Sequence, residues 1–114
     1  MFENIPKIGE RVKFFRMLNG YSQPNLSKAI GKGSDYIVRF ENGHCPPNPS
    51  VILKLCEVFN ISMKEFFDLD IDYIQNSGFF DKLHKINNVK KRKDTAVECF
   101  DKLCKENPLL TIYF

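Results

Sequence analysis

The chain has no tryptophan, only two histidines and no long uninterrupted run of apolar residues. A membrane-spanning helix needs close to twenty consecutive apolar residues, so we expect no spanning segment and no membrane partner. The N-terminal residues Met-Phe-Glu-Asn-Ile-Pro lack the basic stretch followed by an apolar segment that marks a secretory signal. These absences predict a cytoplasmic protein.

Groups suited to catalysis or metal binding are also scarce. The four cysteines show no Cys-x-x-Cys spacing, and in a reducing compartment we expect free thiols. His44 and His84 do not stand at the ligand spacing of a known zinc module. The sequence also lacks a nucleophile motif and a phosphate loop of the Gly-x-x-x-x-Gly-Lys type. We therefore expect no enzyme activity, no metal and no cofactor.

The most informative segment is 20–43, which predicts two short helices joined by a tight turn. Ser22 is a typical cap for the first of them. Leu26 and Ile30 recur at helical spacing and form its apolar stripe. Gly31 then ends the helix, since glycine readily adopts the left-handed conformation required there.

The second helix of this pair is predicted to begin near Ser34. It buries Ile37 and Phe40, which are three residues apart and share one face. Its outward residues are Ser34, Asp35, Val38 and Arg39. Two helices in this arrangement allow the second one to enter the major groove of DNA.

The whole pattern resembles the lambda-repressor-like (XRE/Cro-type) helix-turn-helix family. It reads Gly-x-Ser-Gln-x-x-Leu-Ser-x-x-Ile-Gly, then Tyr-Ile-x-Arg-Phe-Glu-Asn-Gly, then an apolar helix ending in Asn-Ile-Ser. The likeness runs from about Ile8 to Phe67. It implies an all-α, five-helix DNA-binding domain over residues 1–68, with a helical C-terminal extension over 69–114. The implied function is a sequence-specific transcriptional regulator, and such proteins commonly act as repressors.

Three further helices complete the expected five. One helix is predicted over 6–18 from an apolar stripe at helical spacing, which consists of Ile8, Val12, Phe15 and Leu18. Asn48, followed by proline, predicts the start of another helix that ends near Phe59. Ser62 and Glu65 form a capping box ahead of a short last helix.

The resemblance also assigns roles to three polar residues. Arg16 and Glu41 occupy positions that usually form a structural salt bridge between the first helix and the end of the recognition helix. Gln23 occupies the position of a glutamine that lies close to a DNA phosphate. A side-chain amide beside the exposed N–H groups of a helix start suits that contact. The alternative is that Gln23 only caps its helix.

Base recognition is assigned to the second helix of the pair. Arg39 can donate to both O6 and N7 of guanine, whereas Asp35 can only accept, for example from a cytosine amino group. The alternative is that the two pair with each other, four residues apart, on a solvated face. Tyr36 either stacks on a sugar or packs within the protein, and an exposed Val38 suits a thymine methyl. The full predicted DNA-binding set is Gln23, Lys32, Ser34, Asp35, Tyr36, Val38, Arg39 and Asn42.

The positive charge that would attract DNA is modest. The chain carries a formal net charge of +3 at pH 7. Residues 1–68 hold nine lysines and arginines against seven aspartates and glutamates. Because phosphate neutralisation supplies most non-specific affinity, one copy should bind weakly. We therefore expect double-stranded DNA to be read by two copies on two half-sites.

The extension over 69–114 is the expected source of the second copy. It carries an amphipathic helical stripe and an apolar tail, and a free apolar tail is normally buried. The residues assigned to a homodimer surface are Phe79, Phe80, Phe100, Leu103, Leu109, Leu110, Ile112 and Phe114. The alternative is that these residues fold back over the first domain as an intramolecular lid.

The extension also contains the basic cluster Lys90-Lys91-Arg92-Lys93. It is either a patch that follows DNA phosphates or the solvated start of the last helix. A second class of function remains open for the whole chain. A helix-turn-helix fold can serve as a module that binds another protein or a small-molecule effector, with weak or no DNA binding.

Overall fold

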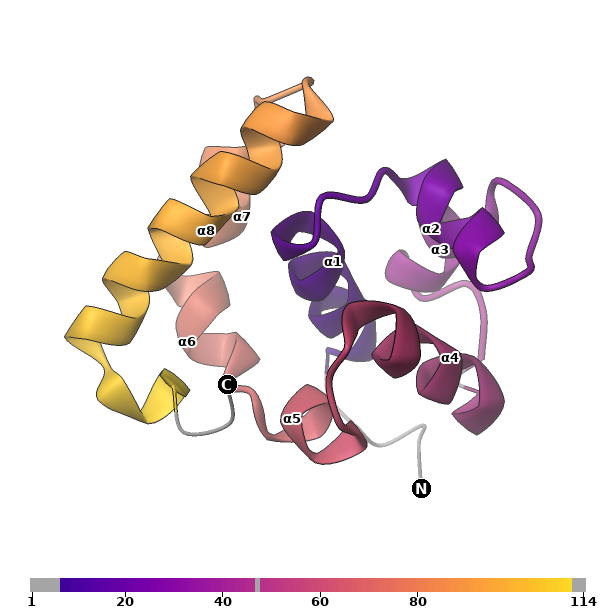
Figure 1. Ribbon diagram of the computed structural model, residues 1–114, viewed down its shortest axis with the longest axis horizontal. Coiled ribbons are helices and arrows are strands. Elements are labelled where there is room, and N and C mark those ends of the chain that lie inside the picture. The colour runs from indigo at the N-terminus through magenta and orange to yellow at the C-terminus, as the bar shows by residue number, and fades with distance from the viewer. Residues whose placement is uncertain (1–6, 47, 112–114) are drawn as a thin grey trace.

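The computed structural model describes residues 7–46 and 48–111, and within these ranges every regular element is a helix (Figure 1). The predicted all-α fold is therefore confirmed. The helices are α1 (Ile8–Leu18), α2 (Gln23–Ala29), α3 (Tyr36–Glu41), α4 (Pro49–Phe59), α5 (Met63–Asp68), α6 (Ile71–Asn76), α7 (Phe79–His84) and α8 (Val89–Glu106), followed by a short 3-10 helix, η2 (Pro108–Thr111). No helix in these ranges is both long and apolar enough to cross a membrane.

The predicted caps of α4 and α5 are confirmed. Asn48 Oδ1 accepts the N–H of Ser50 at 2.9 Å. Ser62 Oγ accepts the N–H of Glu65, and the Glu65 carboxylate accepts the N–H of Ser62, both at 3.0 Å. These bonds satisfy N–H groups that a helix start otherwise leaves unpaired, so the local sequence fixes where each helix begins.

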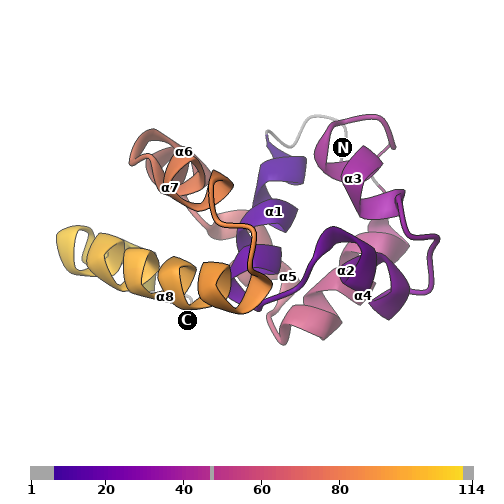
Figure 2. The same ribbon diagram turned by 90° about the horizontal axis from the view of Figure 1, so that it is seen from above.

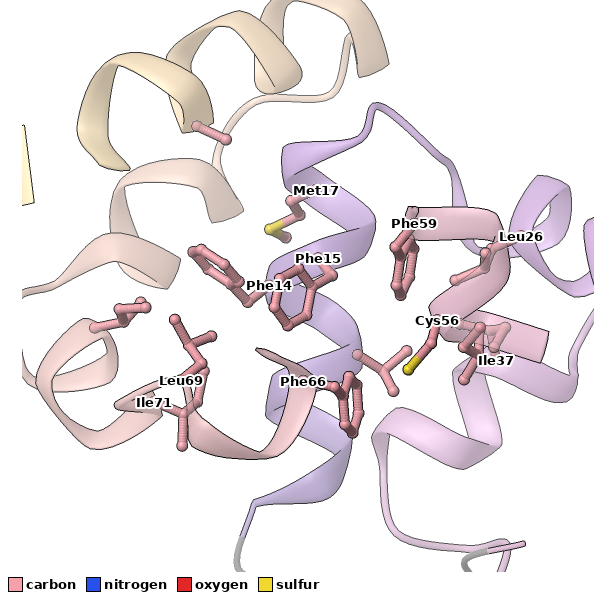
Figure 3. Close-up of a cluster of buried hydrophobic side chains, with 14 of the residues drawn as sticks. Phe14, Phe15, Met17, Leu26, Ile37, Cys56, Phe59, Phe66, Leu69 and Ile71 are labelled. Carbon is pink, nitrogen blue, oxygen red and sulfur yellow. The ribbon is translucent and has the colours of Figure 1, made fainter. Parts of the chain in front are cut away.

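Helix α1 lies at the centre of the molecule because its two sides pack on different parts of the chain (Figure 3). The ring centroid of Phe15 lies 5.8 Å from that of Phe59 in α4 and 5.9 Å from that of Phe66 in α5. The ring of Phe14 lies 5.2 Å from the rings of both Phe79 in α7 and Phe100 in α8. One continuous core thus joins the predicted DNA-binding domain to the extension.

The helix α1 begins at Ile8, with Lys7 before it in the left-handed conformation. The predicted start at Pro6 lies outside the described residues. The helix stops at Asn19 and Gly20, as predicted, and Gly20 has a φ of +76°.

A buried arginine bonds to residues on both sides of residue 68, where the boundary between the DNA-binding domain and the extension was predicted. Arg11 Nη1 donates to the carbonyl oxygen of Phe66 at 3.0 Å and to that of Leu69 at 2.7 Å. These bonds pair carbonyl groups around the end of α5 with a charged donor, which makes them stronger than bonds between neutral groups. The link from α5 to α6 is therefore held directly against α1.

Candidate nucleic-acid interface

The start of α2 and the turn into α3 are fixed by local hydrogen bonds. Ser22 Oγ accepts the N–H of Asn25 at 3.1 Å, which confirms the predicted cap. Gly31 has a φ of +77°, and the N–H of Lys32 donates to the carbonyl oxygen of Ser27 at 2.9 Å. The left-handed glycine and this bond end α2 and redirect the chain toward α3.

Ser27 connects the two helices directly. Its side chain is fully buried, its Oγ donates to the carbonyl oxygen of Gln23 at 3.0 Å, and it accepts the N–H of Ile37 at 3.0 Å. The bond to Ile37 satisfies an N–H in the first turn of α3, which has no partner within its own helix. Ser27 was assigned no role from the sequence. The signal that could have identified it is a small hydroxyl residue directly after the apolar Leu26.

One polar cluster joins three helices, and its members are Arg16, Gln23 and Glu41. Arg16 Nε lies 2.6 Å from Glu41 Oε2, Arg16 Nη2 lies 3.2 Å from Glu41 Oε1, and both side chains are 4% exposed. Gln23 Nε2 donates to the same Oε1 at 3.1 Å. The expected salt bridge is therefore present, and it joins α1 to the end of α3. The Gln23 bond holds the start of α2 against the same carboxylate. An amide nitrogen carries two hydrogens, so Gln23 keeps one donor for a further partner.

The prediction that α3 begins near Ser34 is wrong, because its first helical residue is Tyr36. Asp35 stands at the cap position but its side chain makes no capping bond, and Ser34 is exposed in the preceding turn. The N–H of Tyr36 instead donates to the carbonyl oxygen of Gly33 at 3.1 Å, and Ser27 supplies the next bond. A partner in α2 therefore replaces a local cap.

Asp35 and Arg39 face solvent and lie near each other. Their closest charged atoms, Asp35 Oδ2 and Arg39 Nε, are 3.9 Å apart, and the side chains are 75% and 53% exposed. This is the pair that the spacing of four residues allowed. An exposed pair at this separation contributes at most about 1 kcal/mol, so Arg39 can leave Asp35 for a stronger partner.

The other predicted contact residues of this region differ in exposure. The Tyr36 ring is partly buried against Phe40, with ring centroids 6.1 Å apart, and Lys32 Nζ lies 5.3 Å from the Tyr36 ring. Burial raises the pKa of the Tyr36 hydroxyl above its ordinary value, so the group stays neutral at physiological pH. Val38 is partly buried, and Asn42 is exposed at the end of α3.

Of the eight residues assigned to a dimer surface, the structure describes six, and four of these are buried inside one copy. The buried ones are Phe79, Phe100, Leu103 and Leu110. Phe80 is partly buried with its ring 5.4 Å from that of Phe79, and Leu109 is 68% exposed. Ile112 and Phe114 lie outside the described residues. The four buried side chains pack on α1 and the helices around it, as the alternative of an intramolecular lid predicts. They are therefore not available to a partner.

The four cysteines are free thiols, and Cys56 is buried in the core. Within residues 7–46 and 48–111, histidine, cysteine, aspartate and glutamate form no group of three or more that could hold a metal ion.

Comparison with known proteins places the matched region over the first five helices. The family model described as helix-turn-helix matches residues 12–66. Among curated proteins, the chain is 35% identical over 57 residues to the HTH-type transcriptional regulator YazB of Bacillus subtilis, covering 50% of this chain and 83% of that protein. It is 32% identical over 60 residues to the regulator YgzD of the same organism, covering 53% and 91%. No solved structure matches the chain.

A similar match comes from an archaeon. The chain is 24% identical over 62 residues to the HTH-type transcriptional regulator MJ0272 of Methanocaldococcus jannaschii, covering 54% of this chain and 94% of that protein. Helices α6 to α8 lie beyond the residues that the family model matches.

Proposed function

This chain belongs to the helix-turn-helix family, and from that premise we propose that it is a DNA-binding transcriptional regulator that reads a palindromic operator as a homodimer. In this proposal α3 enters the major groove and Arg39 contacts a base. Binding at a promoter excludes other proteins from it, so the expected outcome is repression.

One observation carries the proposal: α2 and α3 are locked together while their outer side chains are left exposed. Ser27 and the Gln23–Glu41 hydrogen bond fix the relative position of α2 and α3. The Arg16–Glu41 pair in turn ties α3 to α1. Arg39 and Asp35 project into solvent with only a weak mutual interaction. A rigid support under exposed polar groups is the arrangement that base recognition requires, since the groups must be held in the correct geometry before DNA arrives.

The homodimer follows from the weak charge of a single copy and from the two-fold symmetry of paired half-sites. Four of the six assigned residues that the structure describes are buried, so the proposed dimer contact centres on the exposed Leu109. Leu109→Asp should yield monomers in sedimentation velocity. Val97→Asp, a matched change at another exposed apolar residue of the extension, should leave the dimer intact. A Leu109→Asp variant that stays dimeric would remove this surface.

The operator is tested by selection from random duplex DNA. The purified protein is incubated with the library at low and at moderate salt, and the retained DNA is sequenced. We expect a palindromic motif whose half-sites are about one helical turn apart. Enrichment of a single half-site would contradict the dimer, and no enrichment at either salt concentration would contradict DNA recognition.

The second candidate function is a module that binds another protein or a small-molecule effector. One cleft in the extension supports it. The cleft lies between α6, α7 and α8, has a volume of about 380 Å³, and is lined by polar and apolar side chains that include Tyr73, Lys82 and Lys102. A cleft of this size can hold a small ligand. The selection experiment separates the two candidates, because this module would retain no specific DNA.

A further inference from the structure

The basic cluster of the extension lies beside the start of α2. Lys90, Lys91, Arg92 and Lys93 lie in and directly after the first turn of α8, which begins at Val89. In both views this turn is next to the loop that joins α1 to α2 (Figures 1 and 2). A Cβ atom built on Gly20 in that loop would lie 2.7 Å from Lys93 Cδ and 3.4 Å from Lys93 Cγ. The side chain of Lys93 therefore passes directly over the loop.

A groove of about 460 Å³ connects the cluster to α2. Gln23 and Ser22 line one side of it, Arg92 lines the other, and Lys13 and His84 are also at its wall. Among the residues that the structure describes, no acidic side chain lines this groove. Its lining therefore combines cationic groups with the polar residues at the start of α2.

The position of the cations is unfavourable for the fold alone. The N-terminus of a helix carries a partial positive charge, and the first turn of α8 holds basic residues and no acidic one. Burial, and after it the nearby guanidinium of Arg16, lower the pKa of Arg92, while Glu41 opposes them. An anion placed against this turn would relieve both the repulsion among the cations and their conflict with the helix dipole.

We propose that the first turn of α8 is a second phosphate-contacting element, which binds the DNA backbone next to the start of α2. The inference rests on the proposed function, because it takes duplex DNA as the ligand. DNA is the anion that fits, since its phosphates recur along a line long enough to meet both α2 and α8. The extension thus adds sequence-independent affinity that the first five helices, with their small excess of positive charge, lack.

The test replaces the three exposed lysines of this turn in the full chain, as Lys90→Gln, Lys91→Gln and Lys93→Gln together. Arg92 is kept because it lies near the buried Arg16–Glu41 pair. The matched control is the triple change Lys82→Gln, Lys102→Gln and Lys105→Gln. It removes the same charge from exposed positions in the same extension. Thermal unfolding of both variants checks that the fold is retained, and removing cations from a helix start is not expected to lower the midpoint.

The readout is the slope of log K against log salt concentration on one operator duplex and on one random duplex. The cluster variant should give a slope shallower by about 2 to 3 on both duplexes, because each lysine that contacts a phosphate contributes about 1. The control should keep the wild-type slope. Equal slopes for wild type and cluster variant, or equal reductions in cluster variant and control, would overturn the inference while leaving the proposed function intact. Wild-type protein that binds neither duplex at low salt would overturn both.

Discussion

Arg16 and Glu41 are buried as an ion pair, and removing one partner leaves the other charge buried without compensation. Glu41→Ala should therefore lower the free energy of unfolding by about 3–5 kcal/mol. Asp35→Ala instead breaks an exposed pair and should change the free energy of unfolding by at most about 1 kcal/mol. Urea unfolding of both variants measures the difference. Similar losses in the two variants would contradict the structural role of the buried pair.

Cys56 makes the stability of the protein sensitive to alkaline pH. Burial, with a smaller effect from Glu65, raises the pKa of its thiol from the ordinary value of 9.0 to about 11. Between these two values the folded state keeps a proton that the unfolded state releases, so stability falls as pH rises through this window. The full effect is about 2–3 kcal/mol.

Substitution isolates this contribution from other groups that titrate at high pH. We expect Cys56→Ala to be less stable than wild type at pH 8, because it opens a cavity in the core. The difference in unfolding free energy between the two proteins should shrink as pH rises from 8 to 11. Chemical denaturation at several pH values measures it, and a constant difference would show that the thiol does not titrate as described.

At the scale of elements, the contact between α1 and α3 depends on a glycine. A Cβ atom on Gly9 would lie 2.7 Å from the backbone oxygen of Glu41, so Gly9→Ala must push the two helices apart. We expect a loss of about 1–3 kcal/mol in thermal unfolding. Gly33→Ala is the control, because its nearest atom is Asp35 Oδ1 at 3.8 Å and its backbone is not left-handed. It should be neutral or stabilise by up to about 1 kcal/mol. Equal effects would mean that α1 and α3 do not approach closely.

Helix starts were predictable from sequence only where the capping bond is local. Asn48 and Ser62 bond to N–H groups within three residues of themselves, and both starts were predicted correctly. The start of α3 depends on Ser27, ten residues away in sequence, and its prediction near Ser34 was wrong. Within the candidate interface, the Arg16–Glu41 pair was predicted from the family resemblance. Helical spacing could not predict it, because the two residues belong to different helices.

At the scale of the whole molecule, Phe14 joins the extension to the first five helices. Its ring is fully buried between Phe79 and Phe100, so Phe14→Ala should lower the unfolding free energy by about 3–5 kcal/mol. Leu53→Ala, at a side chain that is 52% exposed, should cost less than about 1 kcal/mol. Hydrogen exchange should show α7 and α8 losing protection first in Phe14→Ala. Unchanged protection there would mean that α8 does not depend on α1.

The packing of the extension was beyond sequence reasoning for a physical reason. The predicted apolar stripe of α1 contained Val12 and Phe15 but not Phe14, because helical spacing identifies one face at a time. Helix α1 has a second buried face, which contains Phe14, only because α7 and α8 pack against it. Helix α8 itself was predicted from its apolar stripe. The position of its basic first turn beside Gly20 was not, because it depends on the packing of α7 and α8 on α1.

Base recognition by α3 is the central claim, and the residue that tests it is Arg39. The measurement is the affinity of wild type and Arg39→Ala for the selected operator and for operators changed at single base pairs. We predict a loss of about 1–3 kcal/mol on the operator and a relaxed preference at one base pair. Gln23→Ala should instead weaken binding to all of these sequences similarly. Equal losses on every sequence for Arg39→Ala would contradict base recognition by α3.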